Sequence, residues 1–333
     1  MNNFKHQQSA HCETGVISSL FTHSGLPMSE PMAFGLGSGL AFAYLPLVKI
    51  SGQPLIAYRM PPLFIIKNVC KRLDVKLTSV KFTSQQAGQD ALDTCLNDGK
   101  LVGLQCSVFW LPYFPPEMRF HFNAHNLLVY GKEGNDYLIS DPVADDAVRC
   151  SVEDLNRARF AKGTLAPKGR MYYLEKPPVE PNWNKVIASS IIKTTRILDS
   201  LPLPWIGVNG IKHLGKKIAA LNPEQHKKNS LYLTHIVRMQ EEIGTGGAGF
   251  RFIYGSFLQE ASEKINQPAL AEMAQRMTGI GDNWRKFALD CVQYSRNKSN
   301  NLDLKAIANQ LDQLALAEKN LVKDLARIAK TIK

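Results

Sequence analysis

The chain has 333 residues, of which 44% are hydrophobic and 21% charged, and its formal net charge at pH 7 is +11. These values are typical of a soluble globular protein with one large core or two domains. No run approaches the roughly 18 uninterrupted apolar residues of a membrane-spanning helix, which excludes that class. The basic excess is uneven: residues 181–333 carry 22 Lys and Arg against 13 Asp and Glu, a net +9, whereas residues 1–180 carry 18 against 16, a net +2. The second half is therefore either a solvated lysine-rich surface or a face that attracts an acidic partner.

The N-terminus and the cysteines indicate the cellular compartment. The first thirty residues lack the basic flank and apolar core of a secretion signal. The six cysteines form no C-x-x-C pair and no matched Cys/His spacing, so the sequence indicates neither a metal site nor a disulfide framework. We therefore expect reduced thiols and a cytoplasmic protein. The cysteines are Cys12, Cys70, Cys95, Cys106, Cys150 and Cys291.

The first predicted helix covers about residues 13–24, where apolar side chains recur at helical spacing and Gly25 suits the C-terminal cap. Cys12 then lies at the helix N-terminus. Unpaired backbone amides and the positive end of the helix dipole stabilise a thiolate there, and a thiolate is the form that attacks a carbonyl carbon. Taken alone, a single cysteine in a cytoplasmic protein is more often a small buried hydrophobe.

The glycine-rich run Gly35-Leu36-Gly37-Ser38-Gly39 does not predict a nucleotide site, because no clear parallel strand precedes it and the G-K-[ST] ending is missing. We interpret its glycines as positions where the backbone passes close to the first helix or donates amides near a bound group. No bound cofactor is indicated here.

The rest of the first half alternates helical and β patterns. Further helices are predicted at about 62–73 and 85–98. Short β-rich runs are found at Val75–Phe82, Leu101–Phe109, Leu127–Tyr130 and Tyr137–Ile139. This layout predicts the α+β class.

His125 opens one predicted strand, and Asp141 closes the next. Gly134-Asn135 between them fits a hairpin turn, which would pair the two strands antiparallel. The carboxylate could then hold the imidazole in one tautomer and stabilise its charged form. Together with Cys12 as nucleophile, they predict a triad in which His125 is the base and Asp141 orients it. A surface histidine and an Asp-Pro turn are the alternatives for each residue alone.

A proline-rich run, Lys176-Pro177-Pro178-Val179-Glu180-Pro181, predicts a linker. Beyond it the strand signals vanish, and a 3.6-residue period predicts helices at about 183–200, 209–221, 225–243, 249–265, 268–295 and 302–331. We expect an α+β domain at 1–176, a linker at 177–183 and an all-α helical bundle at 184–333.

The order of a cysteine at a helix start, a histidine opening a strand and Asp-Pro closing the next resembles the papain-like cysteine enzymes, especially the peptidases that trim bacteriocin leaders. A narrower similarity is to the BtrH-like family of butirosin biosynthesis. In the first half it rests on His11-Cys12-Glu13-Thr14, the segment 29–40, His125-Asn126 and Asp141-Pro142. In the second half it rests on the segments 242–251 and 254–261, which resemble the helical domain of unknown function that accompanies the first domain in this family.

This resemblance implies a papain-like first domain and an acyltransferase activity. Cys12 would carry the acyl group, and His125 would take the thiol proton and later that of the acceptor. The implied donor is an acyl or aminoacyl group on the phosphopantetheine of an acyl carrier protein. The implied acceptor is a small-molecule amine or hydroxyl in specialised-metabolite or lipid biosynthesis. Carrier proteins are acidic, which gives the basic second half a candidate partner.

A glycine-rich segment in the second half is a candidate contact for the donor. Gly246, Gly247 and Arg251 could hold a phosphopantetheine phosphate through flexible amides and a guanidinium. Close packing of helices at the glycines is an equally good interpretation.

The oxyanion hole has several candidates. The backbone amide of Cys12 is a natural first donor. Papain-like enzymes usually take the second from a glutamine several residues upstream. Here Gln7 and Gln8 lie slightly close to the cysteine, and His6 and His11 compete for the role.

Other functions stay open at this point. The triad suits a cysteine peptidase or amidase equally well, and a non-catalytic binding module could retain the fold. We expect no nucleic-acid partner, because no base-stacking or helix-turn-helix signature accompanies the basic residues. The oligomeric state, the acyl donor and the acceptor are not indicated.

Overall fold

The computed structural model describes residues 4–50, 52–200, 203–296 and 303–332. It contains two compact units, one formed by Met1–Ala33 and Ile65–Pro181 and the other by Phe34–Phe64 and Asn182–Lys333. The sequence predicts one continuous first domain over 1–176, whereas the structure groups residues 34–64 with the helices of the second half. None of the helices within these described ranges is long and apolar enough to cross a membrane.

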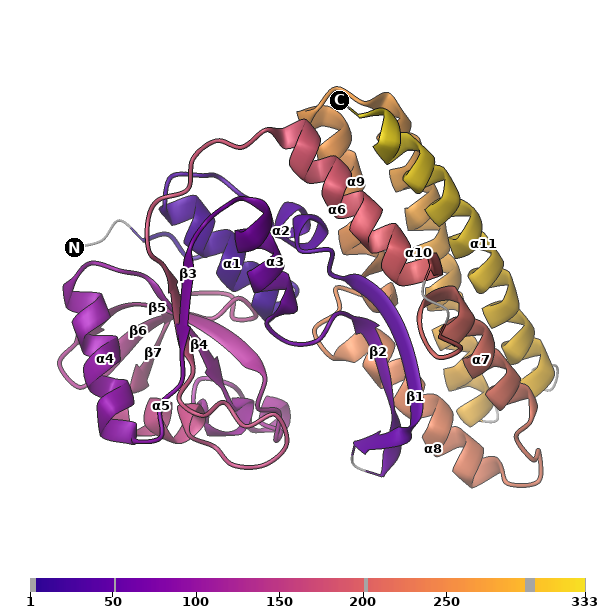
Figure 1. The fold of residues 1–333 in the computed structure, drawn as a ribbon. Helices are drawn as coiled ribbons and strands as arrows, with labels where there is room; N and C mark the ends of the chain where they lie inside the picture. Colours follow the sequence, from indigo (N-terminus) through magenta and orange to yellow (C-terminus); the bar gives the residue numbers. More distant parts are fainter. Residues whose placement is uncertain (1–3, 51, 201–202, 297–302, 333) are drawn as a thin grey trace. The chain divides into compact units, whose positions relative to one another are not determined.

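The first unit is built on a six-stranded antiparallel sheet with the order β3-β8-β4-β5-β6-β7 (Figure 1). Four of the strands confirm those predicted before residue 140. The short strand β7 has no counterpart among the predictions. The strands are β3 (Leu77–Val80), β4 (Val102–Cys106), β5 (His125–Glu133), β6 (Asp136–Ser140), β7 (Val148–Ser151) and β8 (Met171–Leu174).

The helices of the first half are α1 (Cys12–His23), α2 (Glu30–Leu36), α3 (Phe64–Arg72), α4 (Gln85–Asn97) and α5 (Val152–Arg159). Three of them, α1, α3 and α4, confirm the predicted helices. The apolar core lies against the sheet, where Leu92 of α4 and Leu155 of α5 pack with Leu127 and Val129 of β5. Helix α1 contacts β4 and β5. The α+β class is thereby confirmed.

The helices of the second half follow the periodicity of the sequence closely, which confirms the all-α character of that region. Residue 302, at the start of the last predicted helix, lies outside the described residues. The helices are α6 (Trp183–Thr195), α7 (Gly207–Ala219), α8 (His226–Val237), α9 (Arg251–Lys264), α10 (Pro268–Ser295) and α11 (Leu304–Thr331).

An antiparallel hairpin of β1 (Leu40–Ile50) and β2 (Gln53–Arg59) belongs to the helical unit. Phe42 of β1 and Tyr58 of β2 both contact Trp284 of α10, with ring centroids 5.9 and 5.6 Å apart. Burying each such aromatic side chain contributes about 2 kcal/mol. These contacts explain why residues 34–64 group with helices that follow them by more than a hundred positions.

Glu13 connects α1 to α3. Its side chain is buried, and Oε1 accepts hydrogen bonds from the backbone N–H groups of Ile65 (3.1 Å) and Ile66 (3.3 Å) at the start of α3. The first amides of a helix have no partner inside it, so the carboxylate caps α3. This cap fixes α3 beside the residue that follows Cys12.

Replacing Glu13 by alanine should lower the free energy of unfolding by about 1–3 kcal/mol, because two buried amides lose their acceptor. Glu13→Gln keeps an acceptor oxygen in the same place and should cost less. Urea denaturation of both variants measures the difference. Equal losses would contradict the capping role.

Candidate active site

Cys12 is the first residue of α1, and its side chain is 7% exposed. Glu30 holds the chain that leads to it, because its carboxylate accepts hydrogen bonds from the backbone N–H groups of Ala10 (2.9 Å) and His11 (2.8 Å). Burial raises the pKa of Glu30, and these hydrogen bonds and one from Thr14 oppose that rise. The first turn of α1 is thus fixed, with the thiol at the positive end of the helix.

Gly15 allows α1 to lie against the residue after Asp141. A Cβ at position 15 would come within 2.5 Å of Cβ of Pro142, closer than two such atoms pack. The backbone N–H of Ser9 also donates to the carbonyl oxygen of Pro142 at 2.7 Å. The N-terminal segment and the chain after β6 therefore lie side by side.

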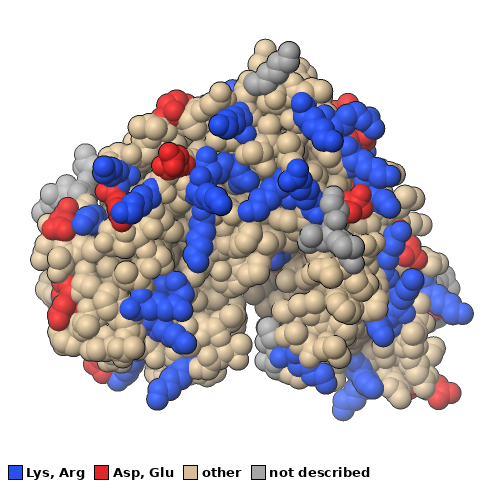
Figure 2. All heavy atoms as spheres, viewed as in Figure 1, with Lys and Arg blue, Asp and Glu red and all other residues tan. Residues whose placement is uncertain are grey.

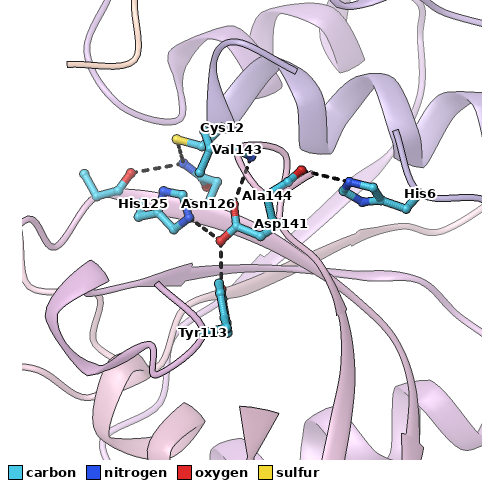
Figure 3. A network of polar contacts seen from close by, with 9 residues as sticks. His6, Cys12, Tyr113, His125, Asn126, Asp141, Val143 and Ala144 are labelled. Atoms are coloured by element: carbon cyan, nitrogen blue, oxygen red, sulfur yellow. Dashed lines mark hydrogen bonds and ion pairs between the residues drawn. The ribbon is translucent and has the colours of Figure 1, made fainter. Parts of the chain in front are cut away.

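His125 and Asp141 face each other at the same end of β5 and β6 (Figure 3). Nε2 of His125 lies 2.6 Å from Oδ2 of Asp141. The turn between the strands contains Gly134 with φ of 59°, a conformation that favours glycine. The hairpin predicted from the sequence is thus present, and it brings the two side chains together.

Asp141 is fully buried and has two further donors. The hydroxyl of Tyr113 donates to Oδ2 at 2.7 Å, and the backbone N–H of Val143 donates to Oδ1 at 3.1 Å. Burial and the charge of Asp141 raise the pKa of Tyr113 well above its usual range, so the phenol stays protonated. Tyr113 belongs to the β4–β5 connection, and its contact with Asp141 was not predicted from the sequence.

Cys12 lies against the imidazole of His125. Burial opposes the charged imidazolium, but the negative charges of Asp141 and Cys12 and hydrogen bonds to both raise the pKa of His125 to about 10. Because Nε2 faces Asp141, Nδ1 is the ring nitrogen that remains for the sulfur. This geometry can keep a thiolate beside an imidazolium that returns a proton later.

Asn126 also reaches the thiol, with Nδ2 4.0 Å from Sγ of Cys12 (Figure 3). The family motif contains Asn126, but no role for it was predicted from the sequence. Adjacent strand residues normally point to opposite faces, so nothing indicated that His125 and Asn126 would both approach the sulfur.

The upstream candidates for the oxyanion hole make other contacts. Nε2 of Gln8 donates to Asp145 at 2.7 Å, and the His6 ring contacts Oγ of Ser140 and the carbonyl oxygen of Ala144. Nδ1 of His11 lies 3.0 Å from Oγ1 of Thr14, and Gln7 is exposed. None of these contacts supports the role predicted for them.

The structure corrects the prediction for Arg251. Its guanidinium is fully buried in the helical unit, where Nε and Nη2 donate to Glu318 at 3.0 and 3.1 Å and Nη1 donates to the carbonyl oxygen of Gly249 at 2.7 Å. A phosphate cannot reach a guanidinium that is enclosed in this way. A Cβ at Gly247 would come within 2.5 Å of Arg285, which favours the packing interpretation for that glycine. For Gly246, the phosphate contact stays a prediction.

Comparisons with known proteins cover both halves of the chain. Residues 11–142, which include Cys12, His125 and Asp141, match the model of the N-terminal domain of butirosin biosynthesis protein H. Residues 153–325 match the model of a domain of unknown function, DUF4872. A solved C39-like peptidase from Bacillus anthracis is similar over 54% of this chain and 98% of its own, with 12% identity and a TM-score of 0.39. No curated protein matches the chain.

The geometry predicts that iodoacetamide reacts with Cys12 before the other thiols. Burial raises the pKa of each of the other five, which keeps them protonated and unreactive: Cys70, Cys95, Cys106, Cys150 and Cys291. Peptide mass spectrometry after brief labelling identifies the modified residue.

The rate at Cys12 should be nearly constant from about pH 6 to about pH 9, because His125 stays protonated up to a pKa of about 10 and keeps the thiolate paired. In His125→Gln, the rate at about pH 6 should fall on the order of 100-fold, since an ordinary thiol is almost wholly protonated there. A wild-type rate that rises tenfold per pH unit would contradict the ion pair.

Proposed function

We propose that this chain, which belongs to the family defined by the N-terminal domain of butirosin biosynthesis protein H and the domain DUF4872, is a cysteine-dependent acyltransferase. The acyl donor is a thioester on the phosphopantetheine of an acyl carrier protein, and the acceptor is a small-molecule amine or hydroxyl. The observation that carries the proposal is the contact series from Cys12 through His125 to Asp141 within the matched region.

The reaction has two halves that use the same groups. The Cys12 thiolate attacks the thioester carbonyl, the carrier thiolate leaves, and His125 gives it the proton taken from Cys12. The acceptor amine then attacks the acyl group on Cys12 while His125 removes its proton, and Cys12 leaves as a thiolate. Asp141 holds the imidazole throughout and stays ionised.

Few water molecules surround the three reacting groups, because Cys12, His125 and Asp141 are 7%, 4% and 0% exposed. A site with little water strengthens the attraction between the thiolate and the imidazolium. The six cysteines are all free, which supports the proposal that the protein works in the reducing cytoplasm.

The net charge of +9 over residues 181–333 keeps the second half a candidate face for an acidic partner. A basic cluster in the first unit, which holds Cys12, is a second candidate. Lys81 follows β3, and its neighbours Lys168 and Arg170 lie on the adjoining chain, where the N–H of Phe82 donates to the carbonyl oxygen of Lys168 at 3.0 Å. The charge of Arg170, slight burial and the charges of Lys168 and Lys67 lower the pKa of Lys81. Within the described residues, none of these four cations pairs with a carboxylate. Figure 2 shows that basic side chains gather in groups on the face drawn there.

The cluster is connected to the candidate nucleophile through the sheet. Nε of Arg170 donates to Oε1 of Gln105 at 3.1 Å, and Gln105 pairs with Asn126 across β4 and β5. Asn126 is the residue whose amide approaches Cys12. An acidic carrier protein would be attracted to this cluster, which lies in the same unit as Cys12.

Incubation with an acyl-loaded carrier protein should raise the intact mass of the wild-type chain by one acyl group. Cys12→Ala should show no increase, and His125→Gln should acylate far more slowly. Adding an amine acceptor should discharge the adduct and form an amide. If no acyl class gives an adduct, the proposal fails; turnover of peptides without an acyl acceptor would instead favour a cysteine peptidase.

Charge reversal tests the partner separately. Lys81→Glu with Lys168→Glu should slow acylation from the carrier thioester about tenfold, and added salt should reduce the difference. The same variant should react normally with a free pantetheine thioester. Lys216→Glu with Lys217→Glu, on exposed positions of α7, is the matched control and should leave both rates unchanged. A larger effect in the control would place the docking face in the second half.

A further inference from the structure

The side-chain amide of Asn126 is held at both ends. Nδ2 donates to the carbonyl oxygen of Ala124 at 3.1 Å, and Oδ1 accepts a hydrogen bond from the hydroxyl of Tyr172 at 2.9 Å. The side chain is fully buried at the start of β5. A backbone carbonyl can only accept, so the nitrogen of the amide must face Ala124, and the orientation of the amide follows.

Tyr172 keeps this orientation in the charged site. Burial, followed by the negative charges of Glu13 and Cys12, raises the pKa of Tyr172 well above its usual range. The phenol therefore stays protonated and continues to donate to Oδ1. An amide with its oxygen fixed in this way cannot turn that oxygen toward the sulfur.

The second N–H of Asn126 faces Cys12. An amide nitrogen carries two hydrogens, and Ala124 takes one of them. The sulfur lies 4.0 Å from Nδ2, at the far limit of a hydrogen bond to sulfur, so the contact in the free protein is weak. When the carbonyl carbon of a substrate bonds to Sγ, the carbonyl oxygen of that substrate lies next to the sulfur. An oxyanion-hole donor must then be about 3 Å from this oxygen, and Nδ2 of Asn126 is a nearby N–H donor.

We propose that Nδ2–H of Asn126 is the side-chain donor of the oxyanion hole, with the backbone N–H of Cys12 as the other donor. This inference rests on the proposed function, since it requires Cys12 to attack a carbonyl group. As the Cys12–carbon bond forms, the carbonyl π electrons move onto oxygen, and Asn126 stabilises that charge without gaining or losing a proton. The electrons return to form the carbonyl when the leaving thiolate departs. Asn126 thus takes the role that the sequence left among Gln7, Gln8, His6 and His11.

Two reactions of the same thiol test this role. Acylation by p-nitrophenyl acetate passes through an oxyanion, whereas alkylation by iodoacetamide displaces iodide at a saturated carbon and forms none. Asn126→Leu should lower the acylation rate on the order of 100-fold and leave the alkylation rate within about threefold of wild type. Tyr172→Phe, which removes only the hydrogen bond to Oδ1, should reduce acylation by a smaller factor and leave alkylation unchanged.

Asn123→Ala is a control for general disturbance of the site. Asn123 lies in the β4–β5 connection, three residues before Asn126, and donates to the carbonyl oxygens of Lys162 and Thr164. Its loss should therefore change both rates together, if at all. Equal falls in acylation and alkylation for the Asn126 variant, or no fall in acylation, would overturn the assignment; if Asn126→Leu does not fold, the Tyr172→Phe rates decide in the same way. The two proposals fail in different ways. If Cys12 of the wild-type protein reacts with neither reagent, the proposed nucleophile is wrong; if it reacts with both and Asn126→Leu does not slow acylation selectively, only the role of Asn126 is wrong.

Discussion

The carboxylate of Asp141 and the imidazole of His125 meet at 2.6 Å with almost no access to water. Removing two charges from water costs several kcal/mol, so such a pair persists only when other groups satisfy the carboxylate. Tyr113 and Val143 do so here, from the β4–β5 connection and from the chain after β6. This buried pair therefore holds the β4–β5 connection and the chain after β6 in place. It also keeps the His125 imidazolium charged beside Cys12.

The N-terminus of α1 also stabilises the Cys12 thiolate, through the positive end of the helix dipole. Glu30 fixes the residues before Cys12, and Gly15 lets the helix lie against Pro142. The thiol is therefore placed between the positive end of a helix and an imidazolium, both of which favour the thiolate. All of these contacts lie within one compact unit.

The sequence could predict the parts of the site that depend on local structure. The turn at Gly134 brought His125 and Asp141 together, and the apolar spacing after Cys12 placed it at a helix start. Contacts between distant segments gave no such signal. Tyr113 reaches Asp141 from a connection without periodic pattern, and Arg251 is neutralised by Glu318, 67 residues further on. The sequence also did not predict that residues 34–64 group with the helical unit. Their aromatic contacts are with Trp284, more than two hundred positions further along the chain.

An NMR titration of the His125 ring nitrogens, assigned among the eight histidines with His125→Gln, measures the central charge pair directly. We expect an imidazolium protonated on both nitrogens at neutral pH, with a pKa near the value of about 10 that Asp141 and Cys12 impose against burial. In Cys12→Ala that pKa should fall, because one of the two negative charges is lost. A wild-type pKa close to the ordinary value of about 6.5, or one that Cys12→Ala leaves unchanged, would contradict the coupling of Cys12 to His125.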